Sequence, residues 1–213
     1  MMNYLQMKKK AMLNYVSGIT PPLPSEYQEC EYIESDGQQY IDSGVKLQFE
    51  SGFEVKFYNK SRTASSNFGA IFGGGSTGTQ RIYSLTSYYN SMIRWGVWGG
   101  TIAYIRQNTL QECSLRNEVF TDCNGNQTTL TKVADESQYN TYLFGNNSGG
   151  SFNFGGLGCR IYYLKFYDDT DTLIRNFIPC YHKTSGEIGM YDTVTQTFYT
   201  NAGSGSFTKG QDV

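Results

Sequence analysis

Charged residues are scarce in this sequence of 213 residues: Asp, Glu, Lys and Arg make up 17% of it, whereas about 25% is usual for a globular domain. The 17 Lys and Arg residues nearly balance the 19 Asp and Glu residues, which leaves a net charge of -2. Binding to nucleic-acid phosphates requires a concentrated basic surface. We therefore expect no nucleic-acid partner.

Long hydrophobic runs are also missing. No stretch reaches the roughly 18 uninterrupted apolar residues that a membrane-spanning helix needs, so we expect no membrane association. The first residues, MMNYLQMKKKAMLNYVSGI, carry a basic cluster at 8–10, as a secretory signal does. The apolar part that follows is short, is interrupted by Asn14, Tyr15 and Ser17, and lacks a small-residue cleavage site. We predict that this segment is not a signal peptide.

Catalytic motifs are absent too. The single histidine, His182, would have to belong to any triad or histidine-based metal centre, and its neighbours Cys180, Lys183 and Glu187 form no recognisable nucleophile arrangement. The patterns G-x-S-x-G and G-x-x-x-x-G-K-[ST] do not occur. Glycosidases need two suitably placed carboxyl groups, and the acids of residues 29–36 do not form the E-x-D-x-x-E pattern of sandwich glucanases. We predict a protein that is not an enzyme and has no cofactor.

Five cysteines are present, without a C-x-x-C pair, so a zinc site or a dense disulfide framework is not expected. The favoured interpretation is buried, reduced thiols in a protein that folds in a reducing cytoplasm. A single bridge between Cys113 and Cys123 across a hairpin is the alternative. The cysteines are Cys30, Cys113, Cys123, Cys159 and Cys180.

Only four prolines occur, and three of them lie within residues 21–24. The sequence PPLP there is typical of an extended, semi-rigid connector. We therefore predict an N-terminal arm and proline hinge over residues 1–24, with Tyr4 to Tyr15 as its one candidate helix, and a domain over residues 25–213.

The domain has the composition of a β protein, with 18 Tyr, 13 Phe and 24 Gly. Short alternating segments are separated by Gly, Asn, Ser and Thr clusters, as in GFEVKFYNK, where Phe53, Val55 and Phe57 share one face. Asn124–Gly125 predicts a type I′ hairpin turn, and Gly73 to Gly78 predict a loop at the rim. The sequence favours an all-β sandwich or barrel.

Two phrases near the ends of the domain resemble each other: YIESDGQQYIDSG, Tyr32 to Gly44, and FIPCYHKTSGEIGMYDTVTQTFYTNAGSGSF, Phe177 to Phe207. Each contains a strand, a polar turn and a second strand. We interpret them as paired hairpins that bring the ends of the domain together. The alternative is that strand–turn–strand sequences recur in any β protein.

Carbohydrate binding is the main functional candidate, because sugar sites combine aromatic rings with amide and charged side chains. The alternative for the aromatic residues is a role in the core or in cross-strand pairs. The glycan-binding candidates are Tyr88, Tyr89, Asn90, Arg94, Trp95, Trp98, Asn146 and Asn147. The acidic sequence DDTDT offers weak calcium candidates, Asp168, Asp169 and Asp171, although a solvated hairpin turn explains it as well.

Three segments carry a resemblance to a known family: Leu23 to Val45, Leu143 to Gly150 and Gly158 to Phe207, with RIYYLKFY, FIPC, GMYD and FYTN as the sharpest parts. They resemble the concanavalin A-like, laminin-G-like jelly-roll domains of gut bacteria and their phages. The region from 61 to 136 matches only in the rhythm of its strands. The resemblance implies a two-sheet antiparallel jelly-roll sandwich preceded by the extended arm.

The same resemblance implies a non-enzymatic role on a virion made in the host cytoplasm, as a head fibre, capsid decoration or tail adhesin that adheres to cell-surface or mucus glycans. The arm is then expected to bind capsid or tail proteins, and the protein is expected to be a homo-oligomer, with a trimer as our guess. Two alternatives are a bacterial carbohydrate-binding lectin and, less favoured, a glycoside hydrolase. The alternative for the arm is a disordered tail. The candidate anchoring residues are Met7, Lys8, Lys9, Lys10, Met12 and Leu13.

Overall fold

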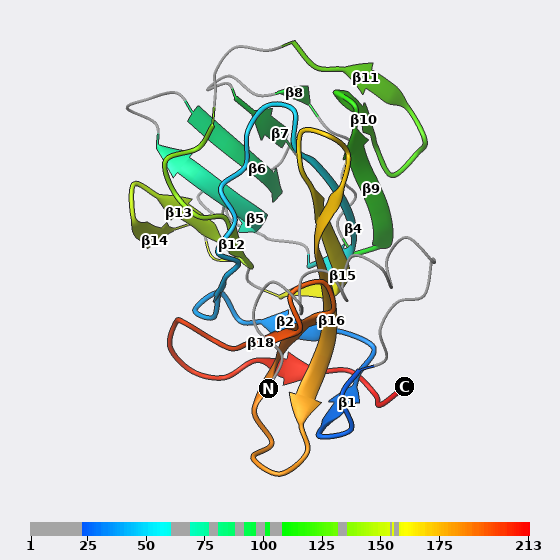
Figure 1. The fold of residues 1–213 in the computed structure, drawn as a ribbon, viewed down its shortest axis with the longest axis vertical. Helices are drawn as coiled ribbons and strands as arrows, with labels where there is room; N and C mark the ends of the chain where they lie inside the picture. Colours follow the sequence, from blue (N-terminus) through cyan, green and yellow to red (C-terminus); the bar gives the residue numbers. More distant parts are fainter. Residues whose placement is uncertain are drawn as a thin grey trace, which may run out of the picture.

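The computed structural model describes residues 23–60, 69–76, 81–87, 92–96, 101–102, 108–131, 136–153, 155 and 158–213. These residues are all-β, and their strands form two sheets, as Figure 1 shows. Within the described residues, no helix is long and apolar enough to cross a membrane.

The larger sheet has eleven strands. Its main path runs through β11 (Gln127–Thr129), β10 (Val119–Thr121), β9 (Leu110–Arg116), β4 (Gly52–Asn59), β15 (Cys159–Tyr167), β16 (Leu173–His182), β17 (Ile188–Asp192) and β18 (Thr197–Tyr199). Beside this path, β1 (Tyr27–Glu29) pairs with β16, and β2 (Ile33–Ser35) pairs with both β15 and β19 (Thr208–Lys209). The first described strands therefore lie in the same sheet as the last one.

The smaller sheet has eight strands. Its main path runs through β14 (Ser151–Asn153), β13 (Asn146–Ser148), β5 (Gly69–Ser76), β6 (Arg81–Ser87), β7 (Met92–Trp95) and β8 (Thr101–Ile102). In addition, β12 (Tyr142–Leu143) pairs with β5 and with β3 (Ile41–Asp42).

One pair of strands corrects the expectation of purely antiparallel sheets. Both β12 and β13 pair with β5, β12 antiparallel and β13 parallel. Between them the chain reverses at Phe144, whose φ is 64°. Because two successive strands of opposite direction lie beside the same strand, one of them has to run parallel to it.

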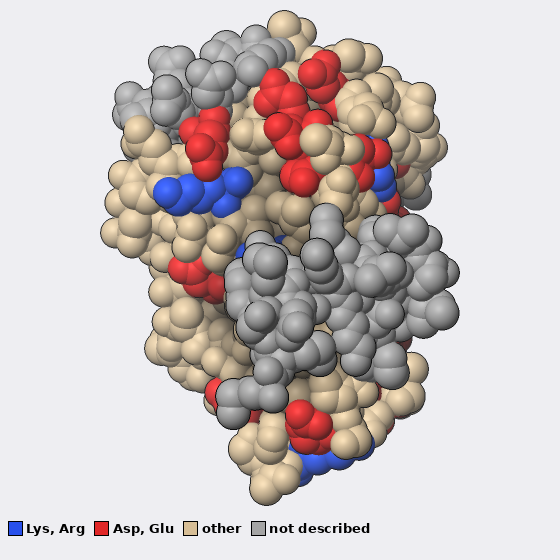
Figure 2. All heavy atoms as spheres, in the orientation of Figure 1, with Lys and Arg blue, Asp and Glu red and all other residues tan. Residues whose placement is uncertain are grey.

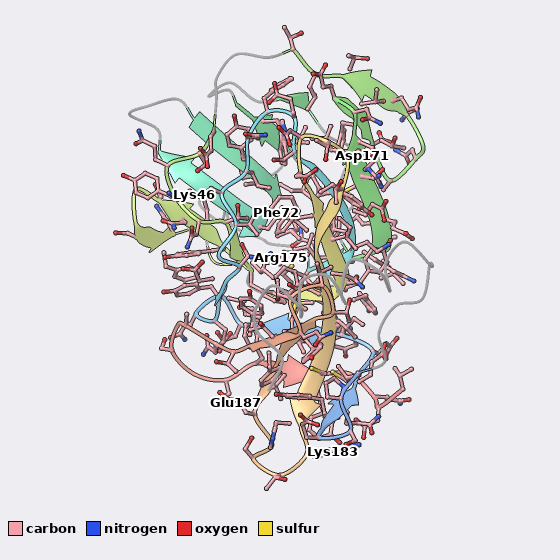
Figure 3. All side chains as sticks on the ribbon, in the orientation of Figure 1. Lys46, Phe72, Asp171, Arg175, Lys183 and Glu187 are labelled. Atoms are coloured by element: carbon pink, nitrogen blue, oxygen red, sulfur yellow. The ribbon has the colours of Figure 1, made fainter. Side chains whose placement is uncertain are left out.

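The core lies between the two sheets. Phe53, Val55 and Phe57 of β4 are fully buried, which confirms the predicted alternation. The ring of Phe53 packs edge-on against Phe72 of β5, with centroids 4.9 Å apart, and Phe72 packs against Phe166 of β15 at 5.4 Å. Figure 3 shows Phe72 in the interior of the molecule. Burial of each such ring stabilises the fold by about 1.5–3 kcal/mol.

The glycine run after Phe72 is part of a strand, contrary to the prediction of a loop from Gly73. A Cβ atom on Gly73 would lie 2.3 Å from the Asn146 side-chain oxygen, and one on Gly74 would lie 2.8 Å from the Asn140 carbonyl oxygen. The glycines are therefore explained by the close approach of neighbouring segments to β5, which leaves no room for side chains.

The hairpin formed by β10 and β11 confirms the predicted strands but not the turn type. Only Gly125 of the predicted pair has positive φ, at 82°. The carboxylate of Asp122 instead accepts hydrogen bonds from the backbone N–H groups of Asn124 and Asn126, at 2.8 and 2.9 Å. A longer turn capped by an aspartate therefore replaces the expected two-residue turn.

The two similar phrases do bring the ends of the domain together, although only the second is a hairpin. β17 pairs with β18, whereas β2 and β3 belong to different sheets, so the first phrase crosses from one sheet to the other. The phrases meet where Ala202 N–H donates to the Tyr40 carbonyl at 2.8 Å and Ser204 N–H donates to the Gln38 carbonyl at 3.3 Å. Figure 1 shows β1 and the C-terminus at the same end of the molecule.

The five cysteines are free thiols, and all except Cys123 are buried. The favoured interpretation of reduced thiols agrees with this, and no Cys113–Cys123 bridge is formed. Burial raises the pKa of the Cys30 and Cys180 thiols to about 12, so both remain protonated at neutral pH.

Candidate functional site

A single row of residues crosses five strands of the smaller sheet. In the strand register, Asp42 of β3 lies opposite Tyr142 of β12, Tyr142 opposite Gly73 of β5, Gly73 opposite Ser84 of β6, and Ser84 opposite Arg94 of β7. Residues directly opposite each other in antiparallel strands share a face of the sheet.

This row faces away from the core. Phe72 and Leu85, the neighbours of Gly73 and Ser84 in sequence, belong to the hydrophobic core. Because successive residues of a strand point to opposite faces, Gly73 and Ser84 point outward. Ser84 is nevertheless only 1% exposed, so other residues of the chain cover this part of the outer face.

Asn146 completes the centre of the row. Its side-chain oxygen lies against Gly73. A Cβ atom on Gly73 would be 2.3 Å from this oxygen and 2.7 Å from the Ser84 Cβ. Asn146 is only 8% exposed. Its Oδ1 and the Oγ1 of Thr141 are the buried side-chain polar atoms that lack a hydrogen-bond partner among the described residues.

A stack of aromatic rings lies next to this centre. Tyr40 stacks on Tyr142 with centroids 4.4 Å apart and on Phe152 of β14 at 4.5 Å. Phe152 and Tyr40 are half-buried, whereas Tyr142 is 9% exposed. Burial raises the pKa of the Tyr142 hydroxyl, and the nearby Tyr40 and Asp42 raise it further. The Phe152 ring also lies against Gly145, the residue before Asn146.

The structure corrects the sugar-stacking prediction for Trp95. The side chain of Trp95 is 2% exposed, and its indole N–H donates to the Phe49 carbonyl oxygen at 2.8 Å. Its ring packs edge-on against Tyr83, with centroids 5.3 Å apart, within the hydrophobic core. A ring enclosed in this way cannot stack on a sugar from solvent. Trp95 is therefore a core residue, which was the alternative to a role in glycan binding.

The other predicted site residues are placed as follows. Asn147 is 4% exposed, and its side-chain oxygen accepts a hydrogen bond from the Gly150 N–H at 2.9 Å, which stabilises the β13–β14 turn. Arg94 is placed by its backbone alone, at the end of the row. The candidates outside the described residues are Tyr88, Tyr89, Asn90 and Trp98 for glycans and Met7, Lys8, Lys9, Lys10, Met12 and Leu13 for anchoring.

The weak calcium candidates lie in the turn between β15 and β16. The carboxylate of Asp168 accepts hydrogen bonds from the N–H groups of Thr170 and Thr172, both at 2.9 Å. Asp171 forms a bidentate pair with Arg116, at 2.6 and 2.7 Å. No group of three or more potential metal ligands occurs among the described residues. The interpretation as a hairpin turn accounts for these contacts.

The outer face of the larger sheet carries a second group of polar side chains. Arg116 joins Glu54 to Asp171 and lies over the Tyr167 ring at 3.6 Å. The hydrogen bond from Arg116 lowers the pKa of Asp171. For Glu54, burial raises the pKa, but hydrogen bonds from Lys165 and other neighbours outweigh it, and the pKa is lowered. These carboxylates are ionised partners of cations, unlike a general acid, which needs a raised pKa.

On the face drawn in Figure 2, the described Lys and Arg side chains lie in small separate groups among mostly uncharged residues. The candidate site is a feature of another kind. It is the row beneath Asn146 together with the aromatic stack, which we call the Asn146 site (Asp42, Tyr142, Gly73, Ser84, Asn146, Tyr40 and Phe152).

Sequence reasoning found one member of this site, Asn146, and missed the others. Tyr40 lies in the first of the two similar phrases, which we interpreted as structural only. Gly73 was assigned to a loop. The signal that could have located the site is the three-glycine run directly after a strongly apolar segment, because such a run indicates a close approach by another part of the chain.

No protein-family model matches this chain, and no curated protein is significantly similar to it in sequence.

Proposed function

We propose that this protein is a non-enzymatic structural protein of a phage particle whose β-sandwich adheres to glycans. One observation carries the adhesive part: a stack of three aromatic rings, with the half-buried Phe152 as its outer ring, lies beside the half-buried carboxylate of Asp42. Sugar sites combine aromatic surface with a few fixed polar groups in this way. The particle setting is supported by the resemblance of the two end phrases to phage jelly-roll domains.

The finer topology belongs to this proposal as well. The described residues form two packed, mainly antiparallel sheets, and this architecture agrees with a concanavalin A-like jelly roll. In this proposal residues 1–24 bind a capsid or tail protein, and the protein forms a homo-oligomer that matches the symmetry of its host site.

The proposed role on a phage particle is tested by measuring whether the protein is part of purified particles. Mass spectrometry of purified particles from the native source should detect the protein at a constant ratio to the capsid or tail proteins. A version that lacks residues 1–22 should be produced at the same level but should be missing from particles. Recovery of the full-length protein only in free form or on cells would exclude the virion role and favour the bacterial lectin.

Phe152→Ala tests adhesion. Phe152 is the half-buried outer ring of the stack, on an edge strand, and loss of one aromatic contact should weaken glycan binding about tenfold. The matched control is Phe198→Ala, because Phe198 is also half-buried on an edge strand but packs on Tyr27 in the other sheet. Binding on a glycan array should fall for Phe152→Ala alone. If both variants bound glycans as tightly as the wild type, the aromatic stack would not be part of the glycan-binding site.

A further inference from the structure

We propose that Asn124 is a modification site, at which the side-chain amide is lost as ammonia without an enzyme and an aspartyl or isoaspartyl residue remains. This inference is independent of the proposed adhesion. Asn124 and Gly125 are the one Asn–Gly pair of the sequence, and they lie in the turn between β10 and β11. The hairpin stands at the end of the larger sheet, where β11 is the last strand of the main path (Figure 1).

The reaction needs only these two residues, a base in solution and water. The backbone nitrogen of Gly125 gives its proton to the base and attacks the side-chain carbonyl carbon of Asn124. The new bond closes a five-membered succinimide ring, the bond from this carbon to the side-chain nitrogen breaks, and that nitrogen takes up a proton and leaves as ammonia. Water then opens the ring at either carbonyl. One product is an aspartyl residue, and the other is an isoaspartyl residue whose backbone runs through the former side chain.

The surroundings of the pair favour this deamidation. Both residues are exposed, so water and base reach them. A Cβ atom on Gly125 would have no other atom within 4 Å, so the turn is open on that side. Because glycine has no side chain, its nitrogen is unshielded and its backbone adopts the conformations that ring closure requires.

Hydrogen bonds within the turn oppose the reaction. The Gly125 N–H donates to the Asp122 carbonyl at 3.0 Å, and the Asp122 carboxylate accepts the N–H groups of Asn124 and Asn126. The Gly125 nitrogen has to leave its acceptor before it attacks, which slows the reaction by up to about tenfold relative to an unfolded peptide. An exposed turn opens locally far more often than the core does. We therefore expect slow but site-selective conversion in the folded protein.

The products alter the hairpin. An aspartyl residue places a second carboxylate close to that of Asp122. An isoaspartyl residue lengthens the backbone by a methylene group, which displaces the Gly125 N–H from the Asp122 carbonyl. Loss of this hydrogen bond should make amide hydrogen exchange in residues 119–129 faster after conversion than before it.

The test incubates the folded, full-length protein at mildly alkaline pH below its melting temperature. Peptide mass spectrometry measures the loss of each amide, and methyl transfer by an isoaspartyl methyltransferase detects the isoaspartyl product. A synthetic peptide of residues 119–130 gives the rate without the fold. The internal control is Asn201, which is followed by Ala202 and has both ends of its amide bound, to the Gly203 N–H at 2.8 Å and to the Gly205 carbonyl at 3.0 Å.

Two variants separate the chemistry from the fold. Asn124→Gln keeps an amide but would have to close a larger ring, so it should abolish the conversion at an unchanged melting temperature. Asp122→Ala removes the side-chain bonds that hold the turn and should raise the rate by up to about tenfold, towards that of the peptide.

Conversion of Asn124 in the folded protein, with Asn201 intact, is the expected result. An Asn124 that keeps its amide while the peptide reacts, or that reacts no faster than Asn201, would overturn the modification site. A rate that Asp122→Ala leaves unchanged would overturn the protection assigned to Asp122.

Discussion

Replacement of Asp192 by alanine is expected to lower the free energy of unfolding by about 3–5 kcal/mol. Asp192, at the end of β17, is fully buried and forms an ion pair with Arg175 at 3.5 Å. Its carboxylate also accepts hydrogen bonds from the backbone N–H of Asn176, at 2.8 Å, and from the hydroxyl of Thr195, at 2.6 Å. Alanine would leave these donors unpaired and Arg175, which Figure 3 shows in the middle of the molecule, without its carboxylate.

Urea denaturation, followed by tryptophan fluorescence, measures this loss. The control is Asp169→Ala, since Asp169 is exposed in the turn between β15 and β16, and surface changes of this kind alter stability by only about 0.5 kcal/mol. If the midpoints of Asp192→Ala and Asp169→Ala were equal, the buried carboxylate would not stabilise the fold as its contacts indicate.

The alternation of apolar residues was sufficient to predict the strands whose two faces differ. In β4, Phe53, Val55 and Phe57 are buried and Glu54 and Lys56 are half-buried, so the period of two is visible in the sequence. The interpretation of DDTDT as a hairpin turn also agrees with the structure, where this sequence connects the paired strands β15 and β16. The all-β class follows from many such segments.

The alternation of apolar residues could not show which face of a strand points to the core. Trp95 was named as a glycan-binding candidate, a role that requires a ring exposed to solvent. Alternation indicates only that two residues share a face. Which face is covered depends on the second sheet, and in β7 both Ile93 and Trp95 point to the core.

Most of the Asn146 site depends on contacts between distant parts of the chain. Gly73 and Asn146 are 73 residues apart in sequence and touch because β12 and β13 both pair with β5. Nothing local to either residue indicates this pairing. Turn sequences were similarly ambiguous, since the strand–turn–strand pattern of residues 32–44 describes a crossing between sheets as well as it describes a hairpin.

That crossing is held by Gln39, which is fully buried. Its side-chain oxygen accepts hydrogen bonds from the Asp36 N–H at 2.8 Å and from the Ser35 hydroxyl at 3.1 Å, and its side-chain nitrogen donates to the Ser204 carbonyl at 3.1 Å. One side chain therefore stabilises the turn after β2 and joins it to the segment that leads into β19. This contact helps to hold the two similar phrases together where they meet.

Gln39→Leu should lower the free energy of unfolding by about 2–5 kcal/mol, because the similar-sized apolar side chain leaves the Asp36 N–H without its partner, at roughly 1–3 kcal/mol, and removes the hydrogen bonds to the Ser35 hydroxyl and the Ser204 carbonyl. The same change at the neighbouring Gln38, which is exposed, should cost less than about 1 kcal/mol. Hydrogen exchange should show faster exchange in residues 201–210 for Gln39→Leu before global unfolding. If that segment kept its protection while stability fell, Gln39 would support the turn after β2 alone, and the ends of the domain would be joined by β19 and β2 without it.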